Sequence, residues 1–197
     1  MIEEFVSAKD RIISASIDII SDAGLESLTI KNISMRTNMS EDMIYKYCSN
    51  TDEILVEVVT TYFMFDKRFF KTLETKRVSY MEKVKLYVDS YSSYYNSYYS
   101  LSSIMLQYEE LLHNTKTRET TEKGYTLRRE GLIILFKGAK ENKEIEVDYS
   151  PEQLADLLLG LFIVCSLNRR VFPSRRSYKE EITILYDKWI KTLGYNN

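Results

Sequence analysis

The chain has 197 residues, of which 44% are hydrophobic, so it is long enough to bury a substantial core. Its formal net charge of −2 gives no overall attraction for nucleic acid, and any DNA contact must therefore come from a local patch. Two prolines and six glycines are few, and hydrophobic residues recur at helical spacing nearly throughout, which predicts an all-α fold.

Several kinds of site are not expected from the sequence. The amino terminus lacks the pattern of a secretory signal, and the longest apolar stretch, residues 154–167, is too short to span a membrane and contains Asp156. The isolated Cys48 and Cys165 fit buried free thiols in a cytoplasmic protein, with a redox switch as the less favoured alternative. His113 is the only histidine, so no metal or other cofactor is expected. No nucleophile elbow or glycine-rich phosphate loop is present either, which argues against an enzyme.

The first predicted helix ends at Gly24, where a left-handed helix stop is expected. It is recognised by a stripe of hydrophobic residues with steps of three and four: Phe5, Ala8, Ile12, Ala15, Ile19 and Ala23.

Two short helices follow with a tight break between them. Thr29 is the predicted N-cap of the second helix, and Ser40 is that of the third. Asn38 lies between them, where a turn requires a positive φ angle that asparagine tolerates well. Residues 29–48 therefore have the pattern of a helix-turn-helix.

A long fourth helix is predicted to open at Asn50, a cap that is followed three residues later by Glu53. Its hydrophobic stripe consists of Leu55, Val58, Val59, Tyr62 and Phe69.

The order of these residues resembles the TetR/AcrR family of bacterial transcriptional regulators. The resemblance implies a helix-turn-helix DNA-binding domain over residues 1–50, extended by the start of the fourth helix (51–70), and an effector-binding and dimerisation domain over residues 71–197. The matching residues are Arg11, Ile13, Ala15, Gly24, Leu28, Thr29, Ile30, Ile33, Ser40, Ile44, Tyr45, Tyr47, Ile54 and Leu55.

The resemblance also implies which residues contact double-stranded DNA, with the third helix in the major groove. Thr29, Ser40 and Tyr45 match positions whose hydroxyls meet phosphate, and Lys46 follows the family's tyrosine. Lys31 and Arg36 are basic and can add contacts to the phosphate backbone of DNA, although Arg36 can equally be a solvated surface charge. For Tyr45 the phosphate contact is preferred over packing between helices, whereas packing is preferred for Tyr47.

Five residues depart from the family pattern: Asn38 replaces a glycine, Cys48 replaces a core phenylalanine, and the other three bear on DNA binding. Glu41 and Asp42 place two carboxylates at the start of the third helix, and Thr51 replaces a lysine at the start of the fourth. Carboxylates repel phosphates, yet one of them can also accept a hydrogen bond from a cytosine amino group. DNA binding is therefore expected to be weaker than is usual in the family, or to depend strongly on dimerisation and low salt.

The most unusual segment is the tyrosine- and serine-rich stretch 87–106. Val84, Tyr87, Val88, Tyr91, Tyr95 and Tyr98 are predicted to lie along one helical face, flanked by Tyr94 and Tyr99. These rings can form a core helix, or they can line a cavity for a planar, aromatic or amphipathic effector. The predicted ligand-binding residues are Tyr87, Tyr91, Tyr94, Tyr98, Met105, Phe136 and Phe162.

Three more helices complete the chain. One begins near Gly124 and ends near Lys143, and another starts with Ser150 as its cap and Pro151 in its first turn. The last helix ends at Gly194 and carries Tyr178, Ile182, Leu185, Trp189 and Leu193 on one face.

The last two helices carry more apolar surface than one side needs. In the family that the chain resembles, this pair forms a four-helix bundle with its twofold copy, which implies a homodimer. The predicted interface residues are Leu157, Leu161, Ile182 and Trp189, and the alternative is that they face the chain's own core. A basic cluster near Pro173 is expected to be solubilising or interfacial: Arg169, Arg170, Arg175 and Arg176.

The sequence thus predicts a cytoplasmic repressor that a small-molecule effector releases from a palindromic operator. The alternative is a small-molecule or protein-binding module of the same fold with little or no DNA binding, which the two acidic residues favour.

Overall fold

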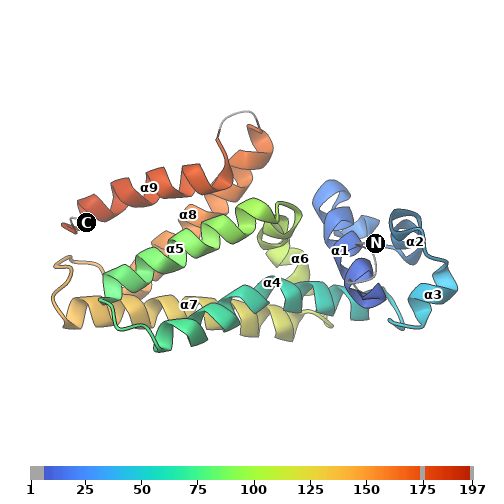
Figure 1. Ribbon diagram of the computed structural model, residues 1–197, viewed down its shortest axis with the longest axis horizontal. Coiled ribbons are helices and arrows are strands. Elements are labelled where there is room, and N and C mark those ends of the chain that lie inside the picture. Colours follow the sequence, from blue (N-terminus) through green and yellow to red (C-terminus); the bar gives the residue numbers. More distant parts are fainter. Residues whose placement is uncertain (1–6, 174–175, 196–197) are drawn as a thin grey trace. The chain divides into compact units, whose positions relative to one another are not determined.

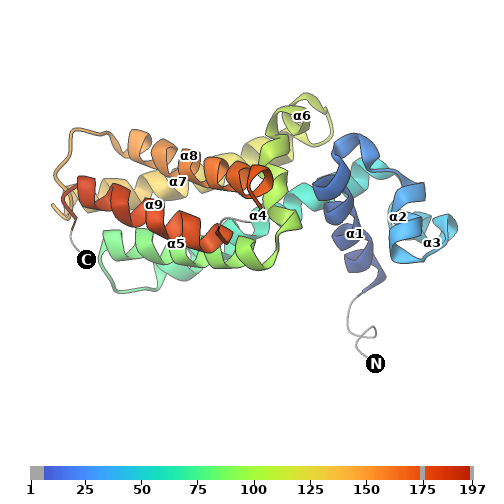
Figure 2. The ribbon, with the colours of Figure 1, turned by 90° about the horizontal axis from the view of Figure 1, so that it is seen from above.

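The computed structural model describes residues 7–173 and 176–195, so the predicted positions of Phe5 and Arg175 lie outside the described residues. Within this part every regular element is a helix, which confirms the all-α prediction (Figures 1 and 2). The elements are α1 (Ala8–Ala23), η2 (Leu25–Ser27), α2 (Ile30–Thr37), α3 (Glu41–Tyr45), α4 (Thr51–Glu74), α5 (Tyr80–Ser97), η3 (Ser100–Gln107), α6 (Tyr108–His113), α7 (Arg118–Glu141), α8 (Pro151–Val171) and α9 (Tyr178–Thr192). Across these described helices, none is both long and apolar enough to cross a membrane.

Side-chain caps set where several helices begin. The hydroxyls of Thr29 and Ser40 each accept a hydrogen bond from the backbone N–H three residues later, as the sequence predicts. The donors are Asn32 N at 3.1 Å and Met43 N at 3.2 Å. Ser150 forms a full capping box with Gln153, and Pro151 occupies the first turn of α8. These bonds satisfy backbone donors that have no partner within the helix.

The predicted stop of α1 is confirmed at Gly24, although its backbone angles differ from the expected left-handed helical pair. Its φ of 83° is positive, but its ψ of 172° is extended, and its N–H donates to the carbonyl of Ile20. Gly24 still fits the position, because a residue with a Cβ would be strained at this φ. Ala23, predicted to belong to the buried stripe, is exposed in the last turn.

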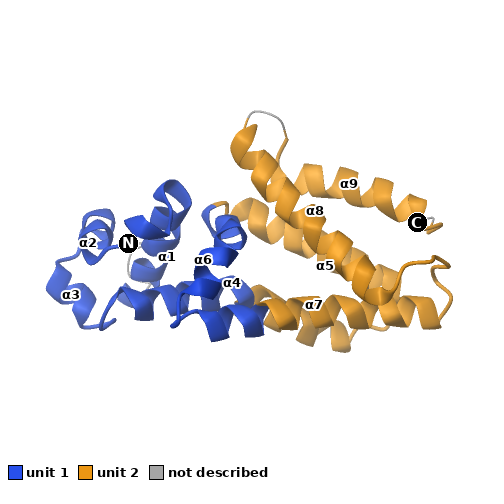
Figure 3. Cartoon of the chain, turned by 180° about the vertical axis from the view of Figure 1, so that it is seen from behind, with its two compact units in different colours: residues 1–63, 100–124 blue, residues 64–99, 125–197 orange. Residues whose placement is uncertain are grey.

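The chain divides into two compact units, which Figure 3 shows in different colours. Unit 1 comprises residues 1–63 and 100–124, and unit 2 comprises residues 64–99 and 125–197. Helices α4 and α7 therefore contribute residues to both units. The unit that contains the helix-turn-helix thus differs from the predicted segment 1–70 in two ways: it ends within α4 at residue 63, and it also includes residues 100–124.

Unit 1 is built around α1, which contacts α2, η2 and η3. Its centre is aliphatic, with Ile12, Ile33, Ile44 and Val58 shielded from solvent. The side chain of Arg11 donates to the carbonyl of Thr37 at 2.9 Å and so ties α1 to the end of α2. The orientation of the helix-turn-helix is thus fixed by packing and by this bond.

Unit 2 packs α9 against both α5 and α8. The buried face of α5 carries Tyr87, Tyr91 and Tyr95, as predicted, but it ends there: Tyr98 caps the helix and is 58% exposed. Two glycines of α7 allow an unusually close approach of aromatic rings, because a Cβ on Gly131 would overlap Phe70 and one on Gly138 would overlap Tyr80.

Candidate functional site

The turn between α2 and α3 has the geometry that the sequence predicts. Asn38 adopts the left-handed conformation, with φ 55° and ψ 34°. The Ser34 hydroxyl donates to the carbonyl of Met39 at 2.6 Å, and the Met39 side chain is buried. This turn therefore joins two short helices into a fixed helix-turn-helix within unit 1.

The outer side of α3 presents polar groups to solvent. Tyr45 is 52% exposed and Lys46 is exposed next to it, while Ile44 of the same helix is fully buried. The helix thus holds its inner side in the core and leaves a phenol and an ammonium free to meet a partner. Both groups donate hydrogen bonds and suit phosphate oxygens.

Glu41 and Asp42 are also exposed, in the first turn of α3. Their charges favour the positive end of this helix locally. They lie one turn before Tyr45 and Lys46, so the exposed part of α3 carries two negative charges and one positive charge. This surface is less favourable for phosphate than a basic helix would be.

Thr29, Lys31 and Ser40 are exposed around the same two helices. The hydroxyls of Thr29 and Ser40 accept the cap bonds, and each retains its own O–H as a donor for phosphate. Thr51 is half-buried at the first position of α4, behind the cap formed by Asn50, whose Oδ1 accepts from Glu53 N at 2.9 Å.

Arg36 is exposed but already engaged, because its guanidinium pairs with Asp22 at 2.5 Å. The pair with Asp22 supports the interpretation of Arg36 as a surface charge more than its interpretation as a contact to DNA phosphates. The packing role preferred for Tyr47 is wrong, since this residue lies beyond the last turn of α3 and is 44% exposed. The buried position that follows it is taken by Cys48.

The tyrosines of α5 form a continuous aromatic cluster in unit 2. Tyr91 stacks on Phe162 of α8, with ring centroids 4.1 Å apart and planes inclined by 13°. Tyr94 is half-buried and stacks on Phe65 of α4 at 5.1 Å. Burial raises the pKa of the Tyr94 hydroxyl, which stays protonated and able to donate at neutral pH. Four of the predicted ligand residues, Tyr87, Tyr91, Tyr94 and Phe162, are thus brought together.

The other predicted ligand residues lie elsewhere. Tyr98 is exposed and contacts the cluster only through Tyr94, at 5.0 Å between ring centroids. Phe136 is buried in unit 2, where its ring centroid lies 6.1 Å from that of Trp189 of α9. Met105 is buried in η3, which belongs to unit 1.

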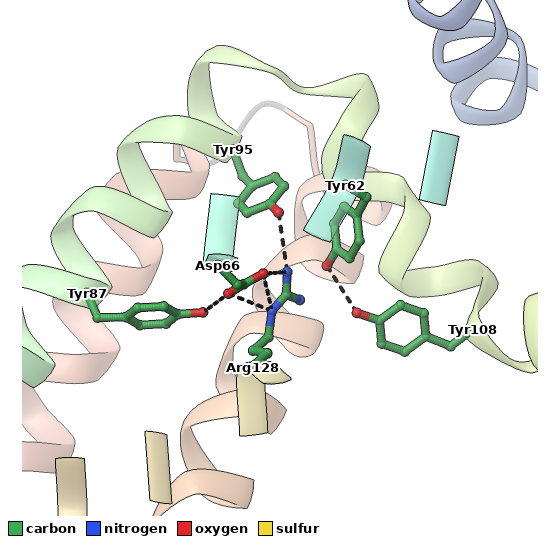
Figure 4. Close-up of polar contacts among 6 residues, drawn as sticks. All are labelled: Tyr62, Asp66, Tyr87, Tyr95, Tyr108 and Arg128. Carbon is green, nitrogen blue, oxygen red and sulfur yellow. Dashed lines mark hydrogen bonds and ion pairs between the residues drawn. The ribbon is translucent and has the colours of Figure 1, made fainter. Parts of the chain in front are cut away.

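A charged pair inside this cluster was not identified from the sequence. Asp66 of α4 and Arg128 of α7 are 0% and 1% exposed, and Arg128 Nη2 lies 2.7 Å from Asp66 Oδ2 (Figure 4). A signal was present, because Asp66 follows Tyr62 by four residues on the buried stripe of α4. A charged residue at such a position indicates a partner that sequence spacing alone does not locate.

The four residues predicted at a dimer interface have different environments. Leu157 of α8 is 46% exposed, and Leu161 is half-buried. Ile182 of α9 is fully buried inside its own chain, so this residue belongs to the core of unit 2. Trp189 is half-buried against Phe136. Further apolar side chains are exposed along α8: Val164, Leu167 and Val171.

The two cysteines are buried and free. Burial raises the pKa of Cys165 to about 12 and raises that of Cys48, so both thiols are protonated and unreactive at neutral pH. Among the described residues no group of three or more His, Cys, Asp or Glu side chains is placed to hold a metal ion. Near the end of α8, Arg169 lies over the ring of Tyr99 at 4.3 Å, which gives part of the predicted basic cluster a packing role.

Comparison with known proteins connects this architecture to one group of structures. No protein-family model and no curated protein sequence matches the chain. Among solved structures, PfmR of Thermus thermophilus, a TetR-family transcriptional regulator, superposes with a TM-score of 0.76 at 15% identity, covering 90% of this chain and 96% of that one. This chain has the fold of the TetR-family transcriptional regulators.

Two other structures with this fold contain ligands. The transcriptional regulator FadR of Bacillus subtilis, in complex with stearoyl-CoA, has a TM-score of 0.73 at 16% identity, covering 90% of this chain and 95% of that one. A Saccharomonospora viridis protein in complex with choline has a TM-score of 0.73 at 18% identity, covering 91% of this chain and 94% of that one. Structures similar to this chain thus hold bound molecules as different as a long acyl thioester and a small cation.

Proposed function

We propose that the chain is a ligand-responsive, DNA-binding transcriptional regulator that acts in the cytoplasm as a repressor. The observation that carries this proposal is a set of exposed hydrogen-bond donors on the helix-turn-helix: Tyr45 and Lys46 at the end of α3, and the cap hydroxyls of Thr29 and Ser40 at the starts of α2 and α3. In this arrangement α3 enters the major groove, and the hydroxyls and Lys31 hold the phosphates on either side.

A homodimer follows from the need to bind a palindromic operator, which is read by two copies related by a twofold axis. The exposed apolar residues of α8 support this proposal, because Leu157, Val164 and Val171 recur every seven residues along one side of the helix. Leu161 lies on the same side. The proposed interface leaves out Ile182, which is buried within its own chain, and includes Trp189, whose side chain is only half-buried.

The aromatic cluster of unit 2 is the proposed effector site. Tyr87, Tyr91, Tyr94 and Phe162 supply flat apolar walls together with hydroxyl groups, which suits an aromatic or amphipathic small molecule. The ligands bound by FadR and by the Saccharomonospora viridis protein support an effector role for this fold. Tyr98 and Phe136, which belong to the same unit, are assigned to the edge of such a site, whereas Met105 belongs to unit 1 and is not included in it.

Effector binding is proposed to move α4, which carries residues of both units, and thereby to change the separation of the two recognition helices. Successive major grooves on one side of B-DNA lie roughly 34–36 Å apart, so a displacement of a few ångströms prevents both helices from docking at once.

The test is selection of fragmented genomic DNA on the purified protein, followed by anisotropy titration of enriched fragments at low and moderate salt. Recovery of a palindrome, bound by a dimer, is the expected result. If no sequence is enriched by a protein that is shown to be a folded dimer, the proposal is wrong.

A second candidate is a small-molecule or protein-binding module with little DNA affinity. It is favoured by one observation, the exposure of both Glu41 and Asp42 on α3. The triple variant Glu41→Lys, Asp42→Gly, Thr51→Lys separates the two candidates. If the variant gains strong DNA binding that the natural chain lacks, the module is supported. Tight operator binding by the natural chain would exclude it.

A further inference from the structure

The ion pair between Asp66 and Arg128 lies at the centre of the aromatic cluster of unit 2. Arg128 Nε lies 3.1 Å from both carboxylate oxygens of Asp66, and Nη2 lies 2.7 Å from Oδ2. Both side chains are almost completely shielded from solvent. Two charges in such a place require partners with good geometry, and here the planar guanidinium fork meets the carboxylate through two nitrogens.

Tyrosine hydroxyls extend this pair to a third helix. Tyr87 donates to Asp66 Oδ1 at 2.6 Å, and Arg128 Nη2 donates to the hydroxyl oxygen of Tyr95 at 3.3 Å (Figure 4). Asp66 comes from α4, Arg128 from α7 and the two tyrosines from α5. The position of α4 relative to α5 and α7 therefore depends on whether the Asp66 carboxylate stays bonded to Arg128 and Tyr87.

Stability does not explain why charges occupy this position. A buried ion pair gains little over well-packed apolar side chains of the same volume, whereas loss of one partner is strongly destabilising. The surroundings are otherwise apolar and aromatic, including Phe65, Tyr91 and Phe162. The pair therefore lies within the aromatic cluster that is the proposed effector site, where a charged group among apolar rings can serve recognition.

The geometry also decides which ligand charge fits. The Arg128 guanidinium already lies over the ring of Tyr91, at 5.3 Å from its centroid, so a cationic ligand would have to displace it from both an aromatic face and a carboxylate. An anionic ligand instead takes the place of Asp66, whose carboxylate has to leave both Arg128 and the Tyr87 hydroxyl. The carboxylate of the ligand can form the same two-nitrogen contact with Arg128, while its apolar part lies against the rings.

We propose that the effector is an amphipathic carboxylic acid whose carboxylate replaces that of Asp66 on Arg128. This inference rests on the proposed function, since it assigns the chemical class of the effector. Asp66 is then an internal competitor that occupies the anion site when no acid is bound. Its release from Arg128 breaks the ion pair that links α4 to α7, so that binding of the acid acts directly on the helix that leads from the DNA-binding segment.

The test uses isothermal titration calorimetry of the full chain with two acids, 2-naphthoate and decanoate. Each acid is compared with an alcohol and a quaternary ammonium compound that carry the same apolar group. The acids are expected to bind at least tenfold more tightly than these analogues. Asp66→Asn removes the competing charge and should tighten acid binding at least tenfold, whereas Arg128→Met should weaken it at least tenfold.

Two further variants separate recognition from loss of folding. The double variant Asp66→Leu, Arg128→Met replaces the pair by apolar side chains, so it should remain folded by circular dichroism and still fail to bind the acids. Arg129→Met is the matched control, because Arg129 is the next residue of α7 and pairs with Asp156 near the surface. It should bind the acids as the natural chain does.

Equal affinity for acids, alcohols and ammonium compounds would overturn the inference. So would unchanged acid binding by the folded double variant, or the absence of acid binding in both the natural chain and Asp66→Asn. Binding of the selected DNA fragments is measured by anisotropy on the same protein preparations, without any acid. A failure of DNA binding therefore counts against the proposed function, and the acid titrations decide the effector class separately.

Discussion

The ring of Phe70 on α4 occupies the space in which a side chain of residue 131 on α7 would begin. Glycine is therefore the residue type at position 131 that lets α4 and α7 approach this closely. At Gly138 the corresponding space is filled by the ring of Tyr80 of α5. Helix α7 accepts aromatic rings at its glycines, and close packing leaves no room for even one methyl group.

Gly131→Ala is accordingly expected to destabilise the chain. The added methyl group forces Phe70 to move, which costs about 1–3 kcal/mol, and the better helix propensity of alanine recovers only about 1 kcal/mol. The free energy of unfolding, measured by urea titration with circular dichroism, should fall. In the background of Phe70→Ala the same substitution should be neutral or stabilising. Equal effects in both backgrounds would show that this contact does not limit the packing.

Lys46 and Arg36 are expected to contribute differently to DNA binding. Lys46 is exposed beside Tyr45, whereas Arg36 is paired with Asp22. Lys46→Ala should lower the slope of log affinity against log salt by about 0.9, the value for one phosphate contact, and Arg36→Ala should change it much less. Anisotropy titrations of a selected operator at several salt concentrations give both slopes. A larger loss for Arg36→Ala would mean that its pair with Asp22 opens on DNA.

Leu157 and Ile182 separate the proposed dimer interface from the core. Leu157→Glu places a charge on the exposed side of α8 and should yield a folded monomer, as judged by light scattering and circular dichroism. Ile182→Ala removes buried methyl groups and should cost about 2–5 kcal/mol of folding stability, with the oligomeric state retained wherever the chain is folded. A dimer that persists in Leu157→Glu would place the interface on another surface.

The pair between Arg129 and Asp156 predicts a pH dependence of stability. Hydrogen bonds from Arg129 Nε and Nη2, at 2.7 and 2.9 Å, lower the pKa of the Asp156 carboxyl. A lowered pKa in the folded state stabilises the chain above the ordinary aspartate pKa of about 4, and this contribution is lost as the pH falls through the lower folded value.

Asp156→Asn should therefore be less stable than the natural chain at pH 7, by at most about 1 kcal/mol because Asp156 is half-exposed, and this difference should shrink as the pH falls below the ordinary aspartate pKa. Urea titrations of both proteins between pH 3 and 7 test this. The difference at pH 7 should also shrink in 1 M salt. A difference that is constant with pH would assign the effect to packing rather than charge.

Local features of the fold could be predicted because each depends on a few neighbouring residues. The caps at Thr29, Ser40 and Ser150 and the left-handed Asn38 follow from hydrogen bonding and backbone sterics within four residues. The helix-turn-helix was therefore recognisable from sequence, together with the exposed Tyr45.

Which neighbour covers a helical stripe could not be predicted. Ile182 and Leu157 both lie on hydrophobic stripes, yet one is fully buried by its own chain and the other is exposed. The sequence period defines a side of the helix and says nothing about the identity of the surface opposite. Tyr47 was misplaced for a related reason, since α3 ends at Tyr45 and the helical pattern no longer applies after it.

The pair of Asp66 and Arg128 lay beyond sequence reasoning because its members are 62 positions apart. Each residue signals only that a partner exists. The choice among many oppositely charged residues is made by the packing of α4 against α7, which brings these two together inside an aromatic surrounding.

The burial of this pair also restricts how the chain can change over generations. Loss of either Asp66 or Arg128 leaves the other charge stranded in the core, at a cost of about 3–5 kcal/mol, which is a large part of the about 5–15 kcal/mol that keeps a typical protein folded. Replacement of both together by apolar residues is expected to cost little folding stability, but the two codons must change at once or pass through an unstable intermediate. Homologues of this protein are thus expected to have both residues or neither. A homologue that has only one of them should carry a new residue of opposite charge nearby.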